Sequence, residues 1–510
     1  MDISEYRTQF SSFNSSLELA RYQKHVGLKS QLTAEQPFRD YSDLFSPAAI
    51  ADLKSQIEQT PSGRETEQAA LAKLLNAARR RFAQTHAREI EHELDRCESA
   101  SGIKWKGNTI SFRQVLFTLA REPNKTERDD LASRWIDAIS NCNDLRAAKF
   151  DSLNNSAAVL GFDSYRRLSL ETTGSSPDYE KTTRSLLEQT ESAYKNALSN
   201  LAGRDFPHVA RDSLSFADLS FLREIPWVDR YLGTRDVSQI QAEMMAGLGI
   251  RFDQKRKIQV DIEARDNRNP SAASFAVNPP HDVRVAASLE NRASTFLDSF
   301  ECLGQALHDL WSSPERARRY PEFVFSPDSS TRRSYGFLFR YLGCDPRWTL
   351  EFISGLSEEQ ATQTARDIGL NLAININSLG ANELCLQDVR DDDQSANDEE
   401  GQGYADLHQR AVSFRRLGEL CLIDLDVSQV PLVELRALAF AFVLREYFRI
   451  RYGYRWWGAR KAGDELIDLW DTASRYSVEE LTSQIGFGEL NFDILTETVK
   501  VALIGAQKIA

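Results

Sequence analysis

A helix with two distinct faces is predicted by the stretch Thr295-Phe296-Leu297-Asp298-Ser299-Phe300-Glu301-Cys302-Leu303-Gly304-Gln305-Ala306-Leu307-His308. Its buried face is indicated by apolar side chains that recur at spacings of three and four residues, namely Phe296, Phe300, Leu303, Leu307 and Leu310. Glu301, Gln305 and His308 lie at i, i+4 and i+7, so they share another face, and Cys302 lies about 100° from Glu301 around the axis. This polar face is a candidate functional site.

A small sheet is predicted just before this helix. Residues 273–277 and 282–286 have the composition of two strands, and Asn278-Pro279-Pro280-His281 between them has that of a turn. Because proline has no backbone N–H to donate to a ladder, the two prolines fit a connection or an edge. Residues 257–262 alternate polar and apolar side chains, as a half-buried strand does.

Helical periodicity dominates the rest of the chain. Gly and Pro number 25 and 15 among 510 residues, about 8%, where average usage would be about 12%. Few chain breakers favour a mainly α-helical protein, with helices expected over residues 64–99, 126–143, 179–201, 237–248, 289–311, 357–377 and 434–452. Residues 388–403 carry two acidic clusters and are expected to form an exposed loop.

Composition restricts the class of protein. The chain has 62 Lys and Arg against 75 Asp and Glu, a net charge of −13, which argues against binding to nucleic acid or to a membrane surface. No apolar stretch approaches 18 residues and the first residues resemble no signal peptide, so a cytoplasmic location is expected. Reduced thiols rather than disulfides are expected because the six cysteines are scattered singly, at 97, 142, 302, 344, 385 and 421.

The segment Gly304-x-Ala306-Leu307-His308 resembles the catalytic helix of zinc peptidases of the thimet oligopeptidase and oligoendopeptidase F type, the gluzincins. Their pattern reads H-E-x-G-H-A-x-H. In this alignment the first zinc-binding His falls on Glu301, the general-base Glu on Cys302 and the second His on Gln305. The motif is therefore degenerate at the three positions that carry the chemistry.

Other segments share the resemblance, which covers residues 90–500. Residues 274–284 resemble the edge strand that precedes the zinc helix in a bacterial branch of the family, and residues 435–464 resemble its C-terminal segment. Residues 330–339 resemble the helix that carries the third zinc ligand, a Glu, which falls here on Arg333. The tyrosines that stabilise the oxyanion fall on Val430 and Glu434. The resemblance implies a large two-lobed helical fold with a small sheet beside the former zinc helix.

These departures predict that zinc, the cofactor that the family would imply, is absent. A catalytic zinc needs three protein ligands, an open position and a base for its water. Gln305 offers only a neutral amide oxygen, Arg333 carries a fixed positive charge, and the thiol of Cys302 is not a carboxylate base. We therefore expect no catalytic residue and no metal ligand at these positions. An ion pair between Glu301 and Arg333 is predicted to replace the metal.

The remaining residues of this face have structural and functional interpretations. Cys302 is expected to be a buried thiol, and His308 a packed or hydrogen-bonded histidine near Gln305. A soft metal held by Glu301, Cys302 and His308 is the alternative. A peptide-binding cleft is predicted to be lined by Phe275, Val277, His281, Tyr454 and Arg460.

The sequence thus predicts an N-terminal helical lobe over residues 1–255 and a C-terminal catalytic-like lobe over residues 256–510, packed as one unit. The predicted function is that of a catalytically inactive homologue of a zinc oligopeptidase that retains peptide binding in its cleft. Two alternatives remain: an active metal-dependent peptidase for short peptides, and a structural or assembly protein with a filled cleft. Peptides are the only partners predicted.

Overall fold

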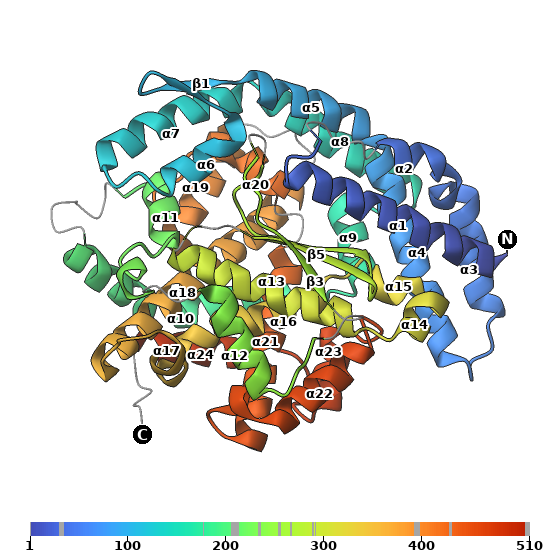
Figure 1. The fold of residues 1–510 in the computed structure, drawn as a ribbon. Coiled ribbons are helices and arrows are strands. Elements are labelled where there is room, and N and C mark those ends of the chain that lie inside the picture. The colour runs from blue at the N-terminus through green and yellow to red at the C-terminus, as the bar shows by residue number, and fades with distance from the viewer. Residues whose placement is uncertain are drawn as a thin grey trace.

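Helices make up most of the chain in the computed structural model, with a small sheet near the centre of the view in Figure 1. The structure describes residues 2–29, 35–176, 178–205, 214–232, 236–252, 257–265, 268–287, 290, 292–391, 398–427 and 431–504. The expected mainly α-helical fold with a small sheet beside the predicted zinc helix is confirmed.

The first part of the chain is almost entirely helical. Its helices are α1 (Ile3–His25), α2 (Glu35–Asp40), α3 (Pro47–Gln59), α4 (Glu65–His86), α5 (Arg88–Ala100), α6 (Val115–Leu119), α7 (Lys125–Ser140), α8 (Asn143–Val159), α9 (Tyr165–Thr173) and α10 (Tyr179–Asp205). A hairpin of β1 (Ile103–Trp105) and β2 (Asn108–Ile110) lies among them. The continuous helix expected over residues 64–99 is wrong in detail, because the chain forms two helices that meet at Ala87.

A disulfide joins Cys97 of α5 to Cys142, which precedes α8. The expectation that all six cysteines are reduced thiols is wrong for this pair. Helices α5 and α8 pack together and bring two cysteines that are 45 residues apart to a Cα–Cα distance of 6.1 Å, within disulfide range. Spacing along the chain carried no signal for this proximity. The other four cysteines form no disulfide and are buried.

The small sheet has three strands in the order β3-β5-β4, formed by β3 (Ile258–Asp261), β4 (Ala273–Asn278) and β5 (Asp282–Ala286). The expected strand, turn and strand are confirmed as the antiparallel pair β4 and β5, in which Phe275 lies opposite Arg284. Strand β3 pairs with β5 in parallel. Because β4 pairs on one side only, it is an edge strand, and α1 lies beside it (Figure 1).

Helices α11 (Phe216–Arg223) and α12 (Val237–Gly247) precede the sheet. After it come α13 (Ala293–Trp311), α14 (Pro314–Arg319), α15 (Pro321–Val324), α16 (Ser330–Arg340), α17 (Pro346–Phe352), α18 (Glu358–Asp391), α19 (Asp398–Val412), α20 (Cys421–Val427), α21 (Pro431–Tyr452), α22 (Arg460–Asp471), α23 (Val478–Gln484) and α24 (Asp493–Ile504). The prediction of a loop over residues 388–403 is wrong where α18 and α19 extend into this segment, because acidic side chains are compatible with a helix. Residues 392–397 lie outside the described ranges.

The central helix α13 crosses α16 at very close range. A Cβ atom on Gly304 would lie 2.1 Å from the carbonyl oxygen of Tyr335, so only glycine allows this approach of the two backbones. Helix α16 packs in turn on α21. The packing therefore places the polar face of α13 beside α16, as the candidate site requires.

The largest hydrophobic cluster contains side chains from α10 to α12 as well as from α13 to α24. It therefore includes residues on both sides of the predicted boundary at residue 255, and the division into two lobes stays a prediction. Within the described ranges, no helix combines the length and the apolar character that crossing a bilayer requires.

Helix α1 is anchored at its start by a buried ion pair. Arg7 donates from Nε to Glu322 of α15 at 2.9 Å, and its Nη2 lies 2.9 Å from Glu67 of α4. The carboxylate of Glu322 is completely buried, and this burial raises its pKa to about 7 although Arg7 opposes the shift. The hydroxyl of Tyr6 donates to the carbonyl of Leu44. These contacts fix the helix that lies beside β4.

The raised pKa of Glu322 predicts a pH-dependent stability. Because the folded state holds a proton that the unfolded chain releases above about pH 4.5, the wild type loses stability as the pH rises toward 7. Replacing Glu322 by Gln removes this loss. We expect the unfolding free energy of the variant, relative to wild type, to rise by roughly 3 kcal/mol between pH 4 and pH 8. Urea unfolding at both pH values measures it, and a difference independent of pH would contradict the prediction.

Candidate functional site

The polar face of α13 lines a cavity of about 610 Å³, here called the central cavity, which is bounded by α1, β4, α13 and α16. Of the predicted site residues, Glu301, Cys302, Gln305, Arg333 and Phe275 all line it. Its volume is in the range of ligand-binding cavities. The structure thus brings the residues that the resemblance aligns with zinc positions together around one cavity.

Arg332 of α16, which lines this cavity, hydrogen-bonds to three other residues. Its Nε donates to both carboxylate oxygens of Asp309, at 2.8 and 3.1 Å, and its Nη1 donates to Oε1 of Gln305 at 2.8 Å. Its Nη2 donates to the hydroxyl and the carbonyl of Ser274, at 3.0 and 3.2 Å. One guanidinium therefore connects α13, α16 and the edge strand β4.

Sequence reasoning missed both Arg332 and Asp309. Asp309 is completely buried, and a buried carboxylate needs a cation and hydrogen bonds to offset its desolvation. The available signal was its position: Asp309 lies four residues after Gln305 and therefore on the same face of α13. A carboxylate there predicts a basic partner on the facing helix.

The predicted pair of Glu301 and Arg333 does not form, because each residue has another partner. Oε2 of Glu301 lies 3.0 Å from Nη1 of Arg340, and its Oε1 accepts a hydrogen bond from Gln305. Arg333 lies 3.1 Å from Glu434 of α21. The reason is geometric: Arg340 follows Arg333 by seven residues, so it lies two turns along α16, where it faces Glu301.

Glu301 is surrounded by charges of both signs. Burial raises its pKa; Arg340 opposes this effect, whereas the neighbouring Asp298 adds to it. Arg340 also contacts Asp298 directly, so one guanidinium pairs with two carboxylates.

Val430, one of the two positions aligned with the oxyanion tyrosines, lies outside the described residues.

Cys302 and His308 are both buried. Cys302 packs with Val283, Val285 and Leu310, and burial raises the pKa of its thiol, so it is not a thiolate nucleophile at neutral pH. His308 stacks on Tyr335 with ring centroids 5.5 Å apart, and its Nδ1 lies 3.2 Å from Asp309.

The donor set at this site does not fit zinc. Two of the three aligned ligand positions hold Gln305 and Arg333, and the third, Glu301, is paired with Arg340. Arg332 adds a fixed positive charge beside Gln305. Across the described part of the chain, no group of three His, Cys, Asp or Glu side chains is arranged to hold a metal ion. A divalent cation would meet guanidinium groups rather than free donors.

The residues predicted to line a peptide cleft lie in different places. Phe275 lines the central cavity and contacts Tyr22 of α1 with ring centroids 5.6 Å apart. Val277 is buried in the hydrophobic cluster that contains Phe275 and Tyr22. His281 is exposed at the turn after β4 and lines a neighbouring cavity. Tyr454 and Arg460 do not line the central cavity.

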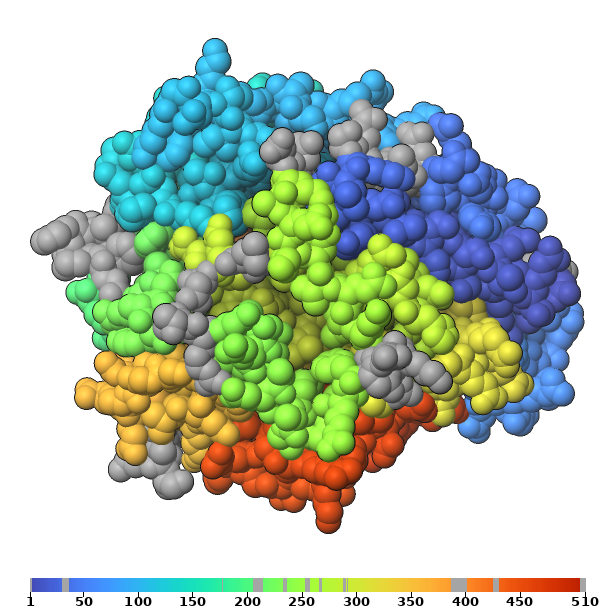
Figure 2. Space-filling view, viewed as in Figure 1, coloured from blue at the N-terminus to red at the C-terminus, as the bar shows by residue number. Residues whose placement is uncertain are grey.

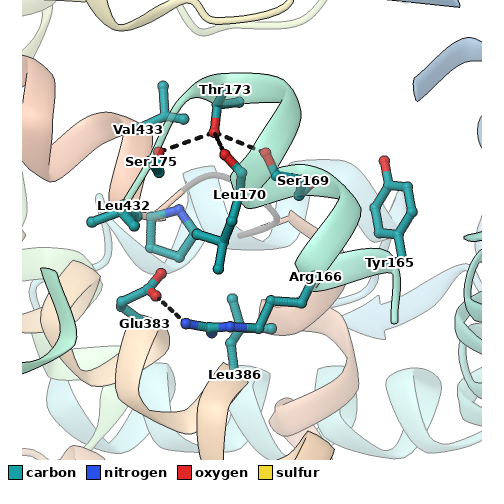
Figure 3. A pocket seen from close by; sticks show the side chains of 11 residues that line it. Tyr165, Arg166, Ser169, Leu170, Thr173, Ser175, Glu383, Leu386, Leu432 and Val433 are labelled. Atoms are coloured by element: carbon teal, nitrogen blue, oxygen red, sulfur yellow. Dashed lines mark hydrogen bonds and ion pairs between the residues drawn. The ribbon is translucent and has the colours of Figure 1, made fainter. Parts of the chain in front are cut away.

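Tyr454 is half-exposed and lies under the guanidinium of Arg347, 4.1 Å from the ring centroid. Arg460 lines a separate cavity beside α12. A further cavity lies between α9, α18 and α21 (Figure 3), where Arg166 meets Glu383 at 2.8 Å. Its volume of about 30 Å³ has room for a water molecule but not for a peptide.

Comparison with known proteins identifies the fold. No protein-family model and no curated protein matches the sequence. The structure is similar to PZ peptidase A with inhibitor 2, with a TM-score of 0.67 and 11% identity over 98% of this chain and 91% of that one. It is also similar to Trypanosoma cruzi metallocarboxypeptidase 1, with a TM-score of 0.62 and 13% identity over 98% of both chains. The chain therefore has the helical fold of these peptidases.

Proposed function

We propose that this protein is a non-hydrolytic peptide-binding protein built on a zinc-peptidase fold. The observation that carries the proposal is the network of Arg332, which joins Gln305, Asp309 and the edge strand at the place where the resemblance would put the metal. A guanidinium fixed by a buried carboxylate repels a divalent cation and leaves no position for an activated water.

Peptide binding is supported by the open space beside β4. The central cavity has a volume of about 610 Å³, although the polar residues that line it pair with one another. An extended peptide can add to the free edge of a sheet through its backbone, and this mode of binding needs no metal. An open cavity next to an edge strand favours this function over that of an assembly protein with a filled cleft.

The experiment measures metal content and hydrolysis on the same preparation. Protein incubated with zinc and dialysed should retain far less than one equivalent, and a quenched fluorogenic peptide should be cleaved no faster than in buffer. A catalytically competent zinc peptidase treated in parallel is the control. One tightly held equivalent, removed by chelator together with peptide cleavage, would refute the proposal in favour of an active peptidase.

Binding is measured separately by fluorescence anisotropy. A labelled peptide of about ten residues, long enough to extend along β4, should bind with saturation and remain intact at the end of the titration. A peptide of the same length with proline at alternate positions is the control, because it has fewer backbone donors to pair with the strand. Equal binding of both peptides would contradict binding by strand addition.

A further inference from the structure

Three cavities follow one another along α1. The central cavity shares Val324 and Phe325 with a cavity at the turn after β4, and it shares Arg21 and Phe275 with a third cavity at the other end. The α1 residues that line them succeed one another along the helix in the same order, from Arg7 to His25. The surface of α1 lies directly against that of the sheet region in Figure 2. The three cavities therefore adjoin one another in a row along α1.

The combined length of the three cavities suits a short peptide. At a rise of 1.5 Å per residue, the part of α1 from Arg7 to Lys24 is about 26 Å long. An extended chain covers that distance with about eight residues, at roughly 3.3 Å each. A peptide in the central cavity would therefore reach the cavities at both ends.

The third cavity, here called the basic cavity, has a volume of about 520 Å³ and a strongly positive lining. Its charged lining residues include five cations, namely Arg21, Lys24, Lys29, Arg113 and Arg268. Glu98 is the one carboxylate among the described lining residues, and it is engaged by Arg146 at 2.8 Å. His25 also lines this cavity, and burial lowers its pKa, so it adds no charge at neutral pH.

Among the cations of the basic cavity, Lys24 and Arg113 share one carboxylate, whereas Arg21 pairs with Glu18 at 2.7 Å. Asp95 lies 3.1 Å from Nζ of Lys24 and 2.7 Å from Nη2 of Arg113, so two cations share one carboxylate. Arg268 pairs with Asp261, which Arg265 also contacts, and Arg265 has a second carboxylate partner in Glu263 at 2.6 Å. Burial and then the neighbouring Arg113 lower the pKa of Lys24, while Asp95 and Glu98 oppose this shift. The lining itself has an excess of cations over carboxylates. An anionic group entering this cavity would offset that excess.

We propose that the basic cavity binds the carboxylate side chains of an acidic peptide whose remaining residues lie along α1 and β4 in the central cavity. The inference rests on the proposed peptide-binding function and specifies its ligand class. Arg113, on the 3-10 helix Phe112–Gln114, is half-exposed and lines the cavity, as does Lys24 of α1.

The test compares three labelled ten-residue peptides by fluorescence anisotropy at low and moderate salt. One is neutral, one carries three Glu residues at its C-terminal end and one carries them at its N-terminal end. At low salt we expect one of the acidic peptides to bind about tenfold more tightly than the neutral one, with the preference decreasing as salt screens the charges. The end that gives the preference reports the direction of the peptide.

The single variant Arg113→Gln and the double variant Lys24→Gln/Arg113→Gln should both weaken binding of the acidic peptide, by about five- to tenfold for the double variant. Neither should change binding of the neutral peptide. Arg113→Lys keeps the charge and should retain the preference. Arg134→Gln is the matched control, because Arg134 is also half-exposed and also pairs with one aspartate, Asp130, on α7.

The outcomes separate the two proposals. Equal affinity for all three peptides would overturn the assignment of the basic cavity while peptide binding stands. An equal loss in Arg134→Gln would also overturn it, because the effect would then reflect net charge alone. Binding of no peptide would refute the proposed function itself.

Discussion

Replacing Arg332 by Met should lower the free energy of unfolding by about 3–5 kcal/mol, the range found when a buried ion pair loses one partner. Methionine keeps the aliphatic part of the side chain and removes the guanidinium. Asp309, which is completely buried, then keeps only the contact with His308. Gln305 and Ser274 lose their hydrogen-bond donors in the same substitution. The midpoint of urea unfolding, followed by tryptophan fluorescence, measures the loss.

Two comparisons show whether the buried carboxylate causes this effect. In a background with Asp309→Asn, where no buried charge is left without a partner, Arg332→Met should have a clearly smaller effect, with a coupling of about 1–3 kcal/mol. Arg134→Met removes an exposed pair with Asp130 and should change stability by less than about 1 kcal/mol. Equal effects in the wild-type and Asp309→Asn backgrounds would show that the network does not depend on this ion pair.

Replacing Gly304 by Ala should destabilise the protein by about 3 kcal/mol, at the upper end of the range for overpacked cores. The added Cβ atom would lie 2.1 Å from the carbonyl oxygen of Tyr335 and 2.9 Å from Cα of Gly336, both of which belong to the backbone of α16. A flexible side chain could move aside, but here the two helices must separate. Their separation would also displace Gln305 from Arg332.

The matched control is Gly403→Ala on α19. Gly403 is exposed within the helix, and nothing lies within 4 Å of an added Cβ atom. Alanine there should stabilise the protein by about 0.5–1 kcal/mol, because it favours the helix more than glycine does. The two substitutions make the same chemical change with opposite expected signs in urea unfolding. A neutral Gly304→Ala variant would mean that α13 and α16 are not closely packed.

The helical faces were predictable because they depend on residues close together in the sequence. The spacing of Phe296, Phe300 and Leu303 predicted the buried side of α13, and all three side chains are buried. The Asn-Pro-Pro-His segment predicted the connection between β4 and β5. The interruption of the helix at Ala87 had no comparable signal, because alanine is the strongest helix former.

The partners of charged residues were harder to predict. Alignment to a family pattern placed Arg333 opposite Glu301, but Arg333 pairs with Glu434 and Glu301 with Arg340. A difference of one position on a helix rotates a side chain by about 100°, so neighbouring arginines on α16 face different helices. Arg332 and Arg333 illustrate this, because one contacts Asp309 of α13 and the other contacts α21.

The sequence by itself determined the helical class, the faces of α13 and the strand pair beside it. These features depend on residue identity and on spacings of a few residues. Only the tertiary structure decided which carboxylate each guanidinium meets, that Cys97 and Cys142 are joined, and that three cavities line up along α1. Ion pairs, disulfides and cavities depend on distances between segments that are far apart in the chain, and local periodicity contains no measure of those distances.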